Sequence, residues 1–244
     1  MFCFCDIVKN MRGHKKIVFI LILALAFCFC KTVLAHQPQI VGSAASVTIK
    51  DPEISKAYYG KLVGSPAVYT INAPAPFHLY VQLLSPQTNV AKTDFSWIIN
   101  KDGQLLAQRE SADSLWPVTY EPFGNDYYFQ GPEFETDSDP GVYTIEISNP
   151  DNQGVYALAV GKIEAFSLSG LVATLAVLPV LKTEYFNEPV WTAYNNFTGL
   201  FALIAVVAIG IVLYVLIRMV FIWRLNKKLD HEYKKLRKGG EGYG

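Results

Sequence analysis

Short segments with alternating apolar and polar residues occupy the middle of the chain. In FHLYVQL (77–83) and VYTIEI (142–147), every second residue is apolar. Successive side chains of a β-strand point to opposite faces, so each segment predicts a strand with one buried face. Pro, Gly, Asn or Asp interrupts these segments about every eight to twelve residues, which is typical of a β-sandwich. We therefore expect an all-β domain over residues 36–165.

Two turn sequences indicate how neighbouring strands connect. The segment FSWIINKDGQLLA reads as a hairpin, because Asp102 and Gly103 are residues that form a two-residue turn. A second tight turn is expected at Asp139, Pro140 and Gly141, directly before a strand.

A resemblance to a known family rests on four motifs in this order: GKL, DGQLLA, PGVYTI and GVYALAV. Their course over roughly residues 57–161 resembles the bacterial pre-peptidase C-terminal domains and related jelly-roll modules. The resemblance implies a jelly-roll-like β-sandwich of eight or so strands that acts as an accessory or binding module without catalysis. The longer, aromatic insertion from Asp113 to Thr136 departs from that family pattern.

The clearest membrane signal is the uncharged run FTGLFALIAVVAIGIVLYVLI, residues 197–217. As a helix it would rise ~31 Å, which matches a hydrocarbon core of about 30 Å. We expect a transmembrane helix over residues 197–223 and a basic cytoplasmic tail over residues 224–244. The positive-inside rule then predicts a single-pass protein of the plasma membrane with its N-terminal domain extracytoplasmic.

The N-terminus has the order of a secretory signal peptide. Basic residues precede the apolar run 17–30, and small residues stand at Val33 and Ala35. Residues 1–35 are therefore expected to be removed, with Met11 as an alternative start. The other interpretation is an uncleaved anchor, although the apolar run is shorter than the ~20 residues that span a bilayer.

Residues 166–196 connect the expected sandwich to the expected anchor. The stretch FSLSGLVATLAVLPVLK predicts a helix with Ser167 as its N-cap. We expect this juxtamembrane helix to lie on the outer leaflet or against the anchor. The alternative is a segment that is re-entrant or docked on the protein core.

Charge and cysteine content exclude several classes of function. Residues 36–196 carry eight Lys/Arg against seventeen Asp/Glu, so this acidic part would repel nucleic acid. All four cysteines precede residue 31, which leaves none for thiol chemistry in a mature domain. No catalytic motif is present, and we expect the protein not to be an enzyme.

Aromatic residues among carboxylates form the main candidate binding site. We expect Trp116, Tyr120, Tyr127 and Tyr128 to contact a ligand, because exposed aromatic rings stack on sugars and attract cations. The alternative is that alternate members of this stretch fill the core. The expected partners are the lipid bilayer and an envelope protein or carbohydrate, for a non-catalytic binding or scaffolding module.

Histidine suggests a second possible function. After cleavage at Ala35, the α-amine and imidazole of His36 belong to one residue, and with His78 they would form a nitrogen set suited to copper. A periplasmic copper-binding protein is therefore the alternative, with an envelope hydrolase third. The opposing interpretation is a disordered N-terminus and a solvated strand histidine.

The mature protein is predicted to begin at His36, because the small residues Val33 and Ala35 direct cleavage there. The intact mass of protein purified from membranes should lack residues 1–35. A mass that includes these residues would contradict the predicted signal peptide.

Overall fold

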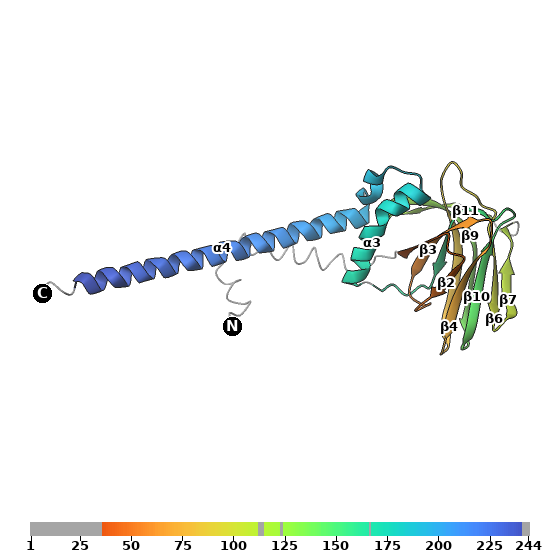
Figure 1. Ribbon diagram of the computed structural model, residues 1–244, viewed down its shortest axis with the longest axis horizontal. Helices are drawn as coiled ribbons and strands as arrows, with labels where there is room; N and C mark the ends of the chain where they lie inside the picture. Colours follow the sequence, from red (N-terminus) through yellow and green to blue (C-terminus); the bar gives the residue numbers. More distant parts are fainter. Residues whose placement is uncertain (1–35, 112–114, 123, 166, 241–244) are drawn as a thin grey trace. The chain divides into compact units, whose positions relative to one another are not determined.

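The computed structural model describes residues 36–111, 115–122, 124–165 and 167–240. The predicted signal peptide at residues 1–35 lies outside them. Within this part, eleven strands form two sheets packed as a sandwich (Figure 1). The first sheet has the order β1 (Gln37–Gly42), β3 (Lys56–Val63), β11 (Gln153–Val160), β5 (Phe77–Pro86), β9 (Asp126–Ser138), β8 (Val118–Glu121). The second has the order β2 (Ser46–Ile49), β4 (Ala67–Ala73), β10 (Gly141–Ser148), β6 (Ser96–Lys101), β7 (Gln104–Arg109).

The expected all-β sandwich is confirmed, with more strands than the resemblance implied. Two parallel pairs, β1 with β3 and β2 with β4, accompany the antiparallel ladders. These pairs place the first strand on the edge of one sheet and the second strand on the edge of the other.

The main core lies between the two sheets and follows the predicted alternation. In β5 and β10 the apolar series is buried, as expected from FHLYVQL and VYTIEI. The largest buried side chain is Trp97, whose indole nitrogen donates to the carbonyl of Pro132 at 3.2 Å. The hydroxyls of Tyr69 and Tyr156 lie 2.9 Å apart, so these buried polar atoms satisfy each other.

The predicted hairpin joins β6 to β7. Asp102 and Gly103 have φ angles of 49° and 78°, as a two-residue turn with both central residues in the left-handed region requires. The carboxylate of Asp102 also accepts a hydrogen bond from the backbone nitrogen of Val142 at 2.9 Å. This bond attaches the hairpin to β10.

The helix that the sequence predicted before the anchor is present, and the linker expected after it contains two further helical turns. Helix α3 (Leu168–Val180) is followed by the π-helical turn η2 (Leu181–Tyr185) and the 3-10 helix η3 (Val190–Tyr194). Ser167 is the N-cap, because its side chain accepts a hydrogen bond from the backbone nitrogen of Gly170 at 2.9 Å. The expected helix and its cap are therefore correct.

The C-terminal part of this segment docks on the sandwich, which is the alternative that the sequence left open. Leu178, Leu181 and other apolar residues of the segment are buried in a second core on the outer face of the β3–β11–β5 region. Small residues of the sheet, Ala57, Ala157 and Ala159, form part of the opposite wall. Alanine leaves room for a helix to approach, so the alternative of docking on protein describes this segment.

Helix α4 (Phe197–Gly240) is the one helix in the described part of the chain that is long and apolar enough to cross a membrane. The apolar stretch lies within Phe197–Tyr233, where an 18-residue window has a mean hydropathy of 3.1. A helix of 44 residues rises about 66 Å, roughly twice a bilayer's hydrocarbon core. It therefore continues beyond the apolar residues into the basic sequence.

Substituting Ala159 by Leu should destabilise the domain, because this fully buried side chain belongs to the second core. Overpacking of this kind costs about 1–3 kcal/mol. Thermal unfolding of purified full-length protein, followed by near-ultraviolet circular dichroism, would measure it. The matched control is Ala44→Leu at an exposed position, which should leave the midpoint unchanged. Equal midpoints for the two variants would contradict the docked arrangement.

Candidate functional site

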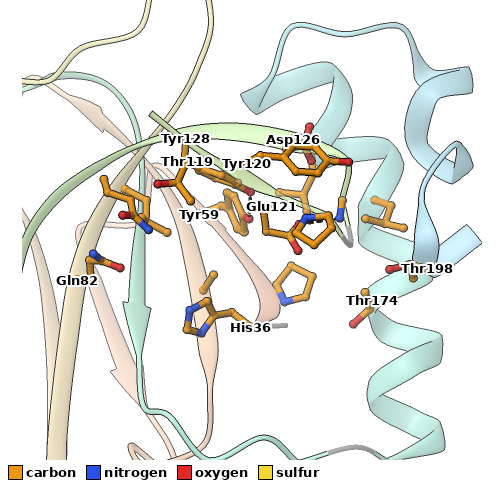
Figure 2. Close-up of a pocket in the computed structure, with 18 residues that line it drawn as sticks. His36, Tyr59, Gln82, Thr119, Tyr120, Glu121, Asp126, Tyr128, Thr174 and Thr198 are labelled. Atoms are coloured by element: carbon orange, nitrogen blue, oxygen red, sulfur yellow. Dashed lines mark hydrogen bonds between the residues drawn. The ribbon is translucent and has the colours of Figure 1, made fainter. Parts of the chain in front are cut away.

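A pocket of about 250 Å³ lies between the outer face of the first sheet and the helical segment that docks on it. Strands β3, β5, β8 and β9 supply one side, and α3 supplies the opposite side through Thr174 and Leu178. His36 and Thr198 also contribute to the lining. Figure 2 shows Thr174 and Thr198 on the helical side, with Tyr59 and Gln82 on the side of the sheet.

Strand alternation explains the polar residues at this pocket. In β9 the pocket-lining residues are Asp126, Tyr128 and Gln130, which are two positions apart. The paired strand β8 places Thr119 opposite Tyr128 and Glu121 opposite Asp126. The turn between the strands is held by Glu121, whose carboxylate accepts a hydrogen bond from the backbone nitrogen of Gly124 at 2.6 Å.

Two buried tyrosines form the inner wall of the pocket. The hydroxyls of Tyr59 and Tyr128 lie 2.6 Å apart, and burial raises the pKa of both. Tyr185 of the helical segment donates to the backbone carbonyl of Tyr59 at 3.0 Å. This wall is therefore made of neutral phenols whose positions are fixed by the sheet and by the docked segment together.

A buried ion pair fastens the docked segment beside the pocket. The side chain of Lys182 is only 1% exposed. Its ammonium donates to the Asp126 carboxylate at 2.5 Å and lies 3.2 Å from the Glu188 carboxylate. Its nitrogen also lies 5.5 Å from the ring centre of Phe186. Burial raises the pKa of Asp126 to about 6, although Lys182 acts in the opposite direction. The desolvation of this carboxylate therefore outweighs its attraction to the lysine.

His36 lies at the pocket but does not meet the other candidate copper ligand. Its Nδ1 is 2.6 Å from the hydroxyl of Ser55, and burial lowers the pKa of its imidazole. His78 lies on β5, with its ring nitrogens 2.7 Å from Asp137 and 2.7 Å from Glu135. The hydrogen bonds that its ring donates to Asp137 and Glu135 raise the pKa of His78.

The sheet order separates the two histidines. His36 directly precedes β1, and β3 and β11 lie between β1 and β5. Three strand spacings of about 4.8 Å amount to about 14 Å, too far for both rings to bind one ion in this arrangement. Among the described residues, no group of three or more His, Cys, Asp or Glu side chains forms a candidate metal site. The structure therefore does not assemble the predicted copper ligands.

The four aromatic candidates occupy three different environments. Trp116 is half-buried against the main core, and Tyr128 is buried at the inner wall of the pocket. Tyr120 and Tyr127 are exposed, with ring centres 5.0 Å apart. Tyr120 also lines the pocket. Of the four aromatic residues expected to be exposed, only Tyr120 and Tyr127 are. Phe123 of the same stretch lies outside the described residues.

Comparisons with known proteins give only distant likenesses. Neither family models nor curated proteins match this chain. Among solved structures, the pre-peptidase C-terminal domain of a collagenase from Bacillus anthracis aligns at 14% identity and a TM-score of 0.26, covering 53% of this chain and 98% of that chain. A β-glucosidase from Paenibacillus barengoltzii aligns at 11% identity and a TM-score of 0.23, covering 52% of this chain and 13% of that chain.

The collagenase domain that aligns is of the type that the sequence motifs resemble. At TM-scores below 0.5, neither likeness carries an argument about the ligand or activity of this chain.

The sequence patterns did not identify Lys182 or its pairing with Asp126, although Asp126 belongs to the carboxylates of the aromatic candidate stretch. One signal for Lys182 was present, because it directly follows the apolar run LVATLAVLPVL. A lysine beside buried apolar residues needs a carboxylate partner. Nothing local identified that partner, which is 56 residues away.

Replacing Lys182 by Met should destabilise the domain by about 3–5 kcal/mol, because it leaves a buried carboxylate without its cation. Denaturant unfolding of full-length protein in detergent would measure the change. The double variant Lys182→Met with Asp126→Asn should recover most of the loss.

The matched control is Lys162→Met, because Lys162 forms an exposed ion pair with Glu135. An exposed pair contributes about 0–1 kcal/mol. Equal effects of the Lys162 and Lys182 substitutions would contradict a structural role for the buried pair.

Proposed function

We propose that this protein is a membrane-anchored, extracytoplasmic binding module that holds a small ligand in the pocket between the first sheet and α3. The pocket carries the proposal, because apolar walls and a few convergent polar groups are the usual features of a ligand site. Glu121, Gln130 and Thr174 reach it from β8, β9 and α3 respectively. Its small volume suits a small molecule or one chemical group of a larger one.

The orientation of the module follows from the charge pattern. The acidic part of the chain precedes α4, and its basic residues follow the apolar stretch. The positive-inside rule places the acidic sandwich on the extracytoplasmic side. The signal peptide predicted at residues 1–35 would give the same orientation.

Binding without turnover is supported by the burial of Ser55, the hydroxyl that lies beside His36. The Ser55 hydroxyl contacts the imidazole, as a serine nucleophile contacts its base, but Ser55 is only 1% exposed. Ser55 is also absent from the pocket lining, so a ligand seated there does not meet this hydroxyl. The proposal therefore assigns His36 a place in the wall and no catalytic role.

Thr174→Trp should fill the pocket from the helical side and abolish ligand binding. The matched control is Val172→Trp, which adds the same ring at a 59% exposed position of the same helix. Saturation-transfer NMR of full-length protein against a library of small polar metabolites and headgroup analogues should find ligands that bind wild type and Val172→Trp but not Thr174→Trp.

Mass spectrometry should recover these ligands chemically unchanged after prolonged incubation. If every ligand that binds wild type also binds Thr174→Trp equally well, the pocket is not the binding site. Conversion of a bound compound by wild type, but not by Thr174→Trp, would replace the binding module with an enzyme.

A further inference from the structure

The charged residues that line the pocket have one sign. Of its 18 lining residues, Glu121 and Asp126 are acidic and none is Lys or Arg. Lys182 pairs with Asp126 but is 1% exposed and lies behind the lining. Burial lowers the pKa of the His36 imidazole, which favours its neutral form, whereas the α-amine released by the predicted cleavage at Ala35 adds one positive charge. Glu121, Asp126 and Glu188 still outnumber this amine and Lys182 by three to two. The field at the pocket therefore favours a positively charged group over an anion.

The remaining walls favour an organic cation over a metal ion. Tyr59, Tyr120 and Tyr128 line the pocket together with Leu84, Leu178 and other apolar residues. Metal ions such as Ca²⁺ require several oxygen ligands around one point, and no candidate metal group exists among the described residues. Aromatic and apolar walls beside a carboxylate suit an ammonium that carries carbon substituents.

We propose that the pocket binds an organic ammonium group, carried either by a small free amine or by a lipid headgroup. This inference rests on the proposed binding function and names the chemistry of its ligand. Thr198 makes a headgroup a realistic source, because it lines the pocket and is the second residue of α4. The uncharged stretch begins at Phe197, so the side of the pocket formed by Thr198 lies at the start of the expected transmembrane segment.

Choline and its neutral isostere 3,3-dimethylbutan-1-ol test the charge requirement, because they share shape and volume but differ in charge. Calorimetric titration of full-length protein in a non-ionic detergent should show choline binding at least about tenfold tighter than the isostere, equivalent to about 1.4 kcal/mol. Thr174→Trp should remove the binding of both compounds, and Val172→Trp should keep it.

Glu121→Gln should reduce the preference for choline over the isostere several-fold while keeping an oxygen for the Gly124 hydrogen bond. The matched control is Glu146→Gln on β10 in the other sheet, which should leave the preference unchanged. Thermal unfolding midpoints equal to wild type would show that both variants are folded.

The source of the ammonium is identified in nanodiscs. If a headgroup enters the pocket, free choline should bind more weakly to protein in discs that contain phosphatidylethanolamine than in discs where diacylglycerol replaces it. Both discs carry the same fraction of phosphatidylglycerol, so that their surface charge is equal. Equal affinity in the two discs assigns the pocket to a free amine.

Equal binding of choline and the isostere would overturn the ammonium inference and leave the binding module standing. Failure of choline and ethanolamine to bind under any condition would overturn it as well. The proposed function would then depend on the separate library screen with Thr174→Trp and Val172→Trp.

Discussion

The buried contact between Lys182 and Asp126 fixes the arrangement on which the pocket depends. Removing an ammonium and a carboxylate from water costs several kcal/mol for each ion, so the pair is tolerated only when its geometry is good. Here the lysine meets Asp126 at 2.5 Å and Glu188 at 3.2 Å. A shift of the helical segment along the sheet would leave one of these charges buried and unpaired. The pair therefore sets the register of the segment, whereas the apolar residues around it supply most of the attraction.

Local periodicity made the strands and the hairpin predictable. The alternation in FHLYVQL and VYTIEI identified the buried faces of two strands. The turn was predictable because Asp102 and Gly103 both adopt positive φ angles, which Asp and Gly tolerate better than most residues. The parallel pairing of β1 with β3, and of β2 with β4, was not predictable. It depends on contacts between separate strands rather than on a local pattern. One signal of the docked layer was overlooked: β11 reads GVYALAV and is apolar at consecutive positions, which is typical of a strand buried on both faces.

The candidate site was partly predictable for the same physical reason. The sequence showed that aromatic residues gather around β8 and β9 but gave no indication of which face would be covered. Tyr128 points to the face that the helical segment covers, and it is buried there, whereas Tyr127 stays exposed. The separation of His36 from His78 was equally unreadable, because two strands from distant parts of the sequence lie between their positions in the sheet.

The construction of the pocket links ligand binding to the docking of the segment that precedes the membrane helix. Tyr59, Glu121 and Gln130 belong to the sandwich, whereas Thr174 and Leu178 belong to the docked helix. A ligand that contacts both sides binds the docked state more tightly than any state in which the helix has moved away. If only the docked state binds, the ligand stabilises docking by RT ln(1 + [L]/Kd). Conversely, any change that raises the docked fraction raises the apparent affinity for the ligand in proportion to that fraction. Any occupant of this pocket thus changes the free energy that holds the sandwich against the residues leading to α4.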